Sequence, residues 1–383
     1  MPSRAQQLLT LGQSVWLDFI RRGHLLSGGF ERDVNEAGVV GVTSNPTIFQ
    51  QAIAGSSDYD AALAEGIARG LEGEPLFEAL ALEDIQMACD RLRATFDASH
   101  GLDGRVSLEV SPRLARDTAG TLAAARRLHA ATARANVMIK TPATAEGLPA
   151  ITATLAAGIS VNVTLIFSVA RHREVMDAWL TGLEQLAAAG GDPASVRSVA
   201  SYFVSRVDSK LDAAIEQRLA TLPAGATERT ELEGLRGKAA VANARLAYAA
   251  FEQTMATPRF QALKHKGAHV QRPLWASTST KNPAYRDVLY VEELIGPDTV
   301  NTMPPATLVA FNEHGRVEPR IRHDVAGAQA VFSRLMGLGI SIDTLIGQLE
   351  GEGVKSFEKS YDDLLAALET RRREMVAQRG TRA

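Results

Sequence analysis

The chain has 383 residues, 45% of them hydrophobic and 22% charged, so it can bury the core of one large globular domain or two ordinary ones. Its 41 Lys and Arg residues against 44 Asp and Glu give a net charge of −3, which excludes a global positive field for nucleic acid or an anionic membrane. A single cysteine, Cys89, excludes an internal disulfide framework. Because no apolar run approaches transmembrane length, we expect a cytoplasmic protein without a membrane anchor.

Short runs rich in strand-forming residues recur along the chain, and longer segments with helical periodicity separate them. There are eight such runs: 15–19, 38–44, 106–111, 136–140, 159–165, 199–204, 272–277 and 299–303. Eight strands alternating with helices predict an α/β fold, a closed parallel (β/α)8 TIM barrel, with its active site at the C-terminal strand ends. We therefore expect one catalytic domain over residues 1–383.

Two long helical insertions account for much of the length beyond the roughly 250 residues that such a barrel needs. They span about 47–105, after the second strand, and about 205–271, after the sixth. The first begins at "NPTIF", where Pro46 suits an early helical position. We expect a C-terminal helix over about 355–378 to pack on the barrel through one apolar stripe: Phe357, Tyr361, Leu364, Leu365 and Leu368.

Polar side chains share one face of several predicted strands, because alternate residues of a strand point to the same side. In "ISVNVTL" (159–165), Asn162 and Thr164 fall on one face, and the apolar residues, Leu165 included, fall on the other. Applied to every strand, this alternation places Lys140 in one barrel mouth with a polar set: Asp18, Asn45, Glu109, Asn162, Thr164 and Ser201.

A buried lysine in such a mouth can condense with a ketone as the neutral amine and form an iminium. The iminium withdraws electrons, so a carbon–carbon bond beside the former carbonyl can break and leave an enamine. One carboxylate must then take the proton of the departing hydroxyl, and a second acid–base group must handle the water released on imine formation. Asp18 and Glu109 are the candidates, and this scheme requires neither a metal nor a cofactor.

Five sequence motifs fall at five predicted strand ends: "GVTSNPTIF" (41–49), "LEVSPRLA" (108–115), "VMIKTPAT" (137–144), "ISVNVTLIFS" (159–168) and "SYFVSRVD" (201–208). In this order they resemble the transaldolase family, the Schiff-base transferases of the non-oxidative pentose phosphate pathway. Segment 272–305 further resembles the longer bacterial branch of that family. The resemblance implies transfer of a dihydroxyacetone unit from sedoheptulose 7-phosphate to glyceraldehyde 3-phosphate, giving erythrose 4-phosphate and fructose 6-phosphate.

The resemblance also implies which residues carry out the chemistry. Lys140 would form the iminium, and Asp18 would be the acid–base carboxylate of carbon–carbon cleavage. Glu109 and Thr164 would hold the catalytic water. The position of Phe203 is the one that the resemblance associates with the choice between transfer and release of the dihydroxyacetone unit.

Substrate contacts follow from the same resemblance. Asn45, Asn162 and Ser201 would bind the hydroxyls of the dihydroxyacetone unit, and Arg206 would bind the substrate phosphate. After strand seven the chain reads "ASTSTKN", two residues longer than in shorter family members, so Lys281 is the candidate for the second phosphate contact. The implied partners are sugar phosphates, and we expect a monomer or a homodimer.

Each candidate also has a purely structural interpretation. Lys140 could be a solvated strand cap, Asp18 and Glu109 could be rim carboxylates paired with arginines, and Asn45 could cap the helix that Pro46 begins. The others would form an internal hydrogen-bond layer, a core ring and surface cations: Asn162, Thr164, Ser201, Phe203, Arg206 and Lys281.

Two other functions compete with transfer. One is a Schiff-base aldolase of the fructose 6-phosphate aldolase type, which releases free dihydroxyacetone by hydrolysing the same intermediate. The other is a non-catalytic barrel that binds sugar phosphates, which the complete set of Lys140, Asp18 and Glu109 disfavours. His265 and His269 have ligand-like spacing, but without an obvious third ligand they do not predict a metal site.

Overall fold

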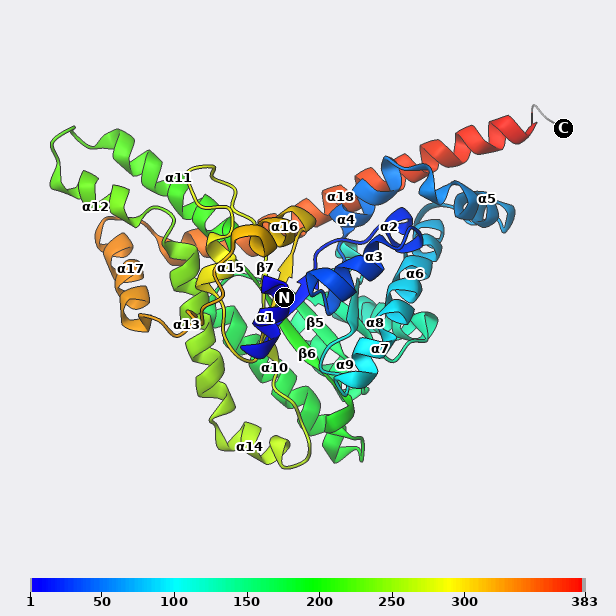
Figure 1. Ribbon diagram of the computed structural model, residues 1–383, viewed down its shortest axis with the longest axis horizontal. Helices are drawn as coiled ribbons and strands as arrows, with labels where there is room; N and C mark the ends of the chain where they lie inside the picture. The colour runs from blue at the N-terminus through cyan, green and yellow to red at the C-terminus, as the bar shows by residue number, and fades with distance from the viewer. Residues whose placement is uncertain (1, 381–383) are drawn as a thin grey trace.

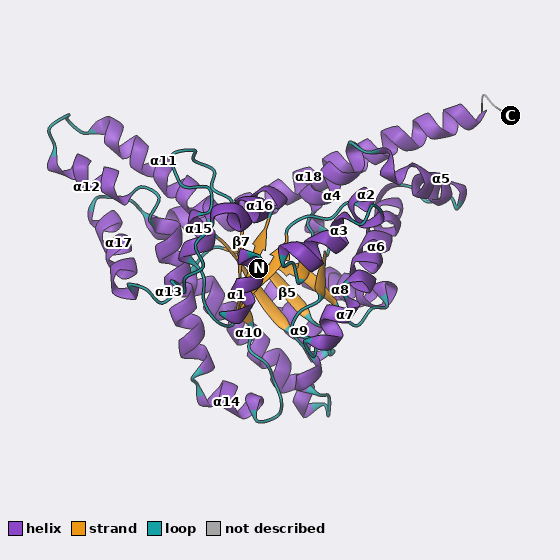
Figure 2. Ribbon diagram, viewed as in Figure 1, coloured by secondary structure: helices purple, strands orange, loops and turns teal. Residues whose placement is uncertain are grey.

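The computed structural model describes residues 2–380, without the side chains of 378–380, and its eight parallel strands close into a barrel in chain order. The strands are β1 (Gln13–Leu17), β2 (Gly41–Thr43), β3 (Arg105–Glu109), β4 (Val137–Pro142), β5 (Val161–Ile166), β6 (Ser198–Phe203), β7 (Arg272–Ala276) and β8 (Thr299–Met303). Helices surround this barrel (Figure 1 and Figure 2). The predicted (β/α)8 fold is confirmed, and the strand boundaries differ from the prediction by only a few residues.

Both predicted insertions are helical. The first contains α4 (Pro46–Ala54), η2 (Ser57–Tyr59), α5 (Asp60–Ala68), α6 (Gly73–Arg91) and α7 (Arg93–Ala98), and the second α11 (Ser205–Thr221), α12 (Thr227–Leu235), α13 (Ala239–Met255) and α14 (Pro258–Lys264). The remaining described elements are α1 (Arg4–Thr10), α2 (Arg22–Leu26), α3 (Gly29–Arg32), η1 (Asp33–Ala37), η3 (Pro112–Leu114), α8 (Thr118–Thr132), α9 (Gly147–Ala156), α10 (Val169–Ala188), η4 (Pro193–Ser195), α15 (Leu289–Glu293), α16 (Pro305–His314), α17 (Val325–Gly337) and α18 (Ile342–Gly380).

The strand register places the polar ends of β3, β4 and β5 next to one another. Glu109 is paired with Lys140, and Lys140 is paired with Asn162. The predicted alternation holds along β5 up to Thr164 and then breaks, because Leu165 adopts a left-handed φ of 62° and the register with β6 shifts between Val163 and Ile166. The expectation that Leu165 continues the outward set of β5 is therefore corrected, and its side chain reaches towards α18 instead.

Helix α18 is longer than predicted. It begins at Ile342 rather than near residue 355, and it lies across the upper end of the barrel in the view of Figure 1. An added Cβ at Gly353 would come within 3.0 Å of Leu165 Cδ2, so this glycine lets the helix approach the barrel closely. The predicted apolar stripe is buried except for the partly exposed Leu365: Phe357, Tyr361, Leu364 and Leu368.

Among the described residues, no single helix has the length and apolar character needed to cross a membrane. One helix pair, α17 with α18, meets those criteria jointly but is bent by 100°.

Gly351 and Gly353, two residues apart in α18, allow a matched test of this close approach. A Cβ at Gly351 would meet no atom within 4 Å, so Gly351→Ala should raise the free energy of unfolding by about 0.5–1 kcal/mol through helix propensity. Gly353→Leu should lower it by about 1–3 kcal/mol, because the side chain would press on Leu165. Urea unfolding measures both; if Gly351→Leu destabilised the protein as much as Gly353→Leu, the close contact would not be the cause.

Candidate active site

Lys140 lies at the C-terminal half of β4 with its side chain directed into the barrel mouth. The residue is only 4% exposed, and its Nζ donates hydrogen bonds to Glu109 Oε2 at 2.9 Å and to the carbonyl oxygen of Ser44 at 3.0 Å. It is therefore not a solvated strand cap. A buried ammonium group held by one carboxylate and one carbonyl has a fixed position and direction.

Asp18, directly after β1, is the second carboxyl group of this mouth. Its Oδ1 accepts a hydrogen bond of 2.6 Å from Thr43 Oγ1, which also lies 2.6 Å from Thr302 Oγ1. Burial raises the pKa of Asp18, although the Thr43 hydroxyl and the charges of Lys140 and Lys281 oppose the shift. Neither hydroxyl partner was among the predicted site residues, although Thr43 shares the strand phase of Asn45.

Glu109 is affected by the same burial. Burial raises the pKa of Glu109, Lys140 opposes this through its charge and hydrogen bond, and Asp18 adds to the rise. Neither carboxyl group is paired with an arginine in the described chain, so the rim ion-pair interpretation does not apply. Two carboxyl groups that favour proton uptake thus flank one amine, an arrangement suited to acid–base catalysis.

A cavity of about 340 Å³ lies above Lys140. Its lining includes eight predicted site residues: Asp18, Asn45, Lys140, Thr164, Ser201, Phe203, Arg206 and Lys281. Glu109 and Asn162 are not part of this lining and connect to it through Lys140 and Ser201, respectively. The prediction missed other lining residues, among them Thr302, Ser277, Ser279 and Phe357. Of these four, only Phe357 had a signal in the sequence, as part of the stripe of α18.

The amide side chains have partners that limit how they can bind a ligand. Asn162 donates from Nδ2 to Ser107 Oγ at 2.9 Å and accepts from Ser201 Oγ at 2.7 Å. Asn45 caps α4 by accepting the Ile48 N–H at 2.9 Å, as its structural interpretation predicted, and still lines the cavity. Thr164 Oγ1 is buried and has no hydrogen-bond partner within residues 2–377. The cavity therefore has unused hydrogen-bonding capacity beside Lys140.

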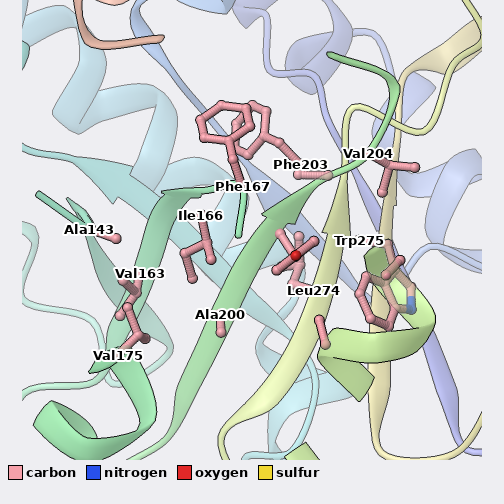
Figure 3. Close-up of a cluster of buried hydrophobic side chains, with 14 of the residues drawn as sticks. Ala143, Val163, Ile166, Phe167, Val175, Ala200, Phe203, Val204, Leu274 and Trp275 are labelled. Atoms are coloured by element: carbon pink, nitrogen blue, oxygen red, sulfur yellow. The ribbon is translucent and has the colours of Figure 1, made fainter. Parts of the chain in front are cut away.

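The other wall of the cavity combines cations with aromatic rings. Arg206 Cζ lies 5.4 Å from the ring centroid of Phe203 and 5.9 Å from that of Phe357, and no carboxylate within the described residues forms an ion pair with it. Burial lowers the pKa of Arg206, opposed by Glu352. The Phe203 ring also lies beside Phe167, with ring centroids 5.2 Å apart (Figure 3). The guanidinium thus contacts two aromatic rings and forms no direct ion pair, and Glu352 acts on it only through its charge.

Lys281 lies in the loop after β7 and donates from Nζ to Ser279 Oγ at 2.7 Å. Burial and the charge of Arg206 lower the pKa of Lys281, whereas Asp18 raises it. Arg206 and Lys281 both line the cavity, so the longer loop after β7 keeps a second positive group within it.

Comparison with known proteins assigns the chain to a family. The family model Transaldolase/Fructose-6-phosphate aldolase matches residues 15–368. The chain belongs to this family. Similar relatives within the transaldolase family include Transaldolase 1 of Streptomyces coelicolor, 52% identical over 95% of this chain and 93% of that protein. Transaldolases of Mycolicibacterium smegmatis and Thermobifida fusca are 50% and 51% identical, over 94% and 95% of this chain and 95% and 97% of theirs. The chain is thus a transaldolase-class transferase of carbohydrate metabolism.

The burial of Asp18 predicts a pH-dependent gain in stability when its charge is removed. Because the folded-state pKa is raised, the folded protein holds this proton more tightly than the unfolded chain, and the contribution of Asp18 to stability falls as pH rises above about 4. Asp18→Asn should therefore raise the free energy of unfolding by about 1 kcal/mol near neutral pH, and the gain should disappear below about pH 4.

Glu109→Gln is the matched comparison for that experiment. It removes the carboxylate from the ion pair with Lys140 and leaves a buried ammonium group without its partner. We expect a loss of about 3 kcal/mol near neutral pH, measured by denaturant unfolding over a pH series. A stability gain for Glu109→Gln would show that burial of the carboxylate outweighs its ion pair with Lys140, and a loss for Asp18→Asn would contradict the burial cost assigned to Asp18.

Proposed function

We propose that Lys140 is the nucleophile with which this protein transfers a dihydroxyacetone unit from sedoheptulose 7-phosphate to glyceraldehyde 3-phosphate. The observation that carries the proposal is the placement of Lys140 Nζ, buried at the bottom of the cavity between Glu109 Oε2 and the Ser44 carbonyl. After losing a proton, the amine attacks the ketose carbonyl carbon, and loss of water from the carbinolamine gives the iminium. Membership of the transaldolase family supports this reaction.

Carbon–carbon cleavage requires a base on the side of the sugar away from the iminium nitrogen. Asp18 would take the proton of the hydroxyl on the second carbon from the iminium carbon. The bond between that carbon and the carbon next to the iminium carbon would break, and its electron pair would form the enamine. The aldose leaves as the aldehyde, and the enamine then adds to the aldehyde of the acceptor by the reverse steps. The raised pKa of Asp18 suits a group that both takes and returns a proton.

Water handling falls to Glu109 and Thr164 in this proposal. Glu109 contacts Lys140 directly, so it can pass the proton that converts the carbinolamine hydroxyl to water. Thr164 Oγ1, buried and free of partners in the described chain, is available to hold that water. Asn45 and Ser201 would bind the dihydroxyacetone hydroxyls from the cavity wall, and Asn162 would orient Ser201 from behind.

Phosphate recognition would come from Arg206 and Lys281. A phosphate dianion is attracted to local cations, and the chain has no global positive charge to supply them. Arg206 offers a fork of donors without a competing carboxylate, and Lys281 adds a second charge at the same end of the cavity.

We also propose a cytoplasmic location, consistent with the single cysteine, and a monomer or homodimer, which size-exclusion chromatography with light scattering would decide.

Lys140 gives the direct test of the proposed chemistry. Borohydride reduction with fructose 6-phosphate should fix the sugar fragment on Lys140, and Lys140→Ala should abolish both the adduct and the transfer activity. Peptide mass spectrometry locates the adduct, and Lys281→Ala serves as the control that should keep it. An adduct on Lys281 or Lys210 would refute the assignment.

Arg206 should contribute binding of phosphate rather than chemistry. Arg206→Ala should raise the KM for phosphorylated sugars by about tenfold or more, with a much smaller effect on free dihydroxyacetone as a donor. Lys281→Ala should act in the same direction but more weakly, since Lys281 is more exposed. If Arg206→Ala impaired both donors equally, Arg206 would support the fold and not the phosphate.

Phe203 should separate transfer from release of dihydroxyacetone, the reaction of the competing aldolase. Its ring lines the cavity and brings no hydroxyl to protonate the enamine carbon or to bind water. Phe203→Tyr should increase free dihydroxyacetone relative to transferred product and leave the Lys140 adduct intact. An unchanged ratio at equal acceptor concentration would show that Phe203 is ordinary packing.

A further inference from the structure

A second cavity, of about 280 Å³, opens at the end of the barrel opposite the active site. Arg105 and Arg272 are the first residues of β3 and β7, and both line it. Arg197 precedes β6, and Lys264 ends α14, the helix at the bottom of Figure 1. We call this space the basal cavity. It is comparable in size with the cavity of about 340 Å³ around Lys140.

Positive charge is in excess in the basal cavity. Its lining holds three arginines, Lys264 and His269 against one carboxylate, Asp298. Asp103, which is not in the lining, forms an ion pair of 3.2 Å with Arg272. Within residues 2–377, Arg105, Arg197 and Lys264 form no ion pair. Arg105 is buried and Arg197 half-buried, whereas Lys264 is exposed. Asp103 and Asp192 act on the two arginines only through their charges, so two guanidinium groups lie at this cavity without a direct acidic partner among the described residues.

The guanidinium groups also keep unused donors. Arg105 is 3% exposed and donates from Nε to the Gly101 carbonyl at 2.8 Å and from Nη1 to Ser160 Oγ at 3.3 Å. Arg197 donates to the carbonyls of Ala194 and His100, but its Nε is buried without a partner within the described residues. A guanidinium has more N–H groups than these bonds use, so donors remain for a ligand.

The charges also oppose one another. Burial and the charges of Arg197 and Arg272 lower the pKa of Arg105 to about 9, opposed by Asp103. Burial and the charge of Arg272 lower the pKa of Arg197 to about 10, opposed by Asp192. An anion between these groups would relieve the repulsion and accept the unused N–H donors. Apolar side chains complete the wall, including Phe260, Leu102 and Val270, which offer a surface to a carbon skeleton.

We propose that the basal cavity binds a small phosphate monoester, with the phosphate between Arg105, Arg197 and Lys264 and its organic group against Phe260. An anion with more than one negative oxygen can accept donors from more than one of these cations, and the size of the cavity leaves room beyond a single phosphate. The site is independent of the sugar-phosphate chemistry at Lys140, since it lies at the opposite strand ends.

Calorimetric titration tests this with phenyl phosphate and inorganic phosphate as probes. The titrated protein is the full chain carrying Arg206→Ala and Lys281→Ala, which removes the phosphate contacts proposed for the active site. Phenyl phosphate should bind at one site per chain and more tightly than inorganic phosphate. Adding Lys264→Gln should weaken it about threefold and adding Arg197→Gln about tenfold.

Lys266→Gln is the matched control, because Lys266 is two residues from Lys264 and is not among the residues that line the cavity. It should leave the affinity unchanged. Absence of binding in the starting protein, equal losses for Lys264→Gln and Lys266→Gln, or no loss for Lys264→Gln would overturn the proposal. If Arg197→Gln does not fold, Lys264→Gln and Lys264→Glu are titrated in its place. Equal affinity for phenyl phosphate and inorganic phosphate would overturn the proposal that an organic group binds against Phe260.

Discussion

The buried pair of Lys140 and Glu109 is the interaction on which the site depends. Removing an ammonium and a carboxylate from water is costly, and a distance of 2.9 Å with a second bond to the Ser44 carbonyl offsets part of that cost. The barrel makes this possible because the register of β3 and β4 pairs these two residues directly. Helix α18 then covers the pair, with the Phe357 ring centroid 5.7 Å from Nζ.

The other charged residues of the site lie around this pair, and the position of each suits the role proposed for it. Asp18 and Glu109 lie deep in the mouth, where burial raises the pKa of both and favours proton exchange. Arg206 and Lys281 line the same cavity, and in the proposed function they offer their charge to a phosphate dianion. A chain with a net charge of −3 can therefore bind sugar phosphates through a local field alone.

Much of the active-site arrangement was predictable because side chains alternate between the two faces of a strand. Alternation was sufficient to place Lys140 beside Glu109, since both are on regular strands. It failed at Leu165, where a left-handed residue and a register shift end the pattern, and it could not foresee the Ser44 carbonyl, which depends on backbone direction. The early start of α18 was missed because the predicted apolar stripe began only at Phe357, whereas packing on the barrel extends the helix back to Ile342.

A crystal structure of the protein reduced with borohydride in the presence of fructose 6-phosphate tests the central claim most directly. The account predicts continuous density from Lys140 Nζ to the second carbon of the sugar fragment, with Glu109 and Thr164 beside the new bond. Where the phosphorylated sugar is retained, its phosphate should contact Arg206. Density joining the fragment to another lysine would contradict the account. So would a sugar that lies in the cavity after complete reduction without a covalent bond to Lys140.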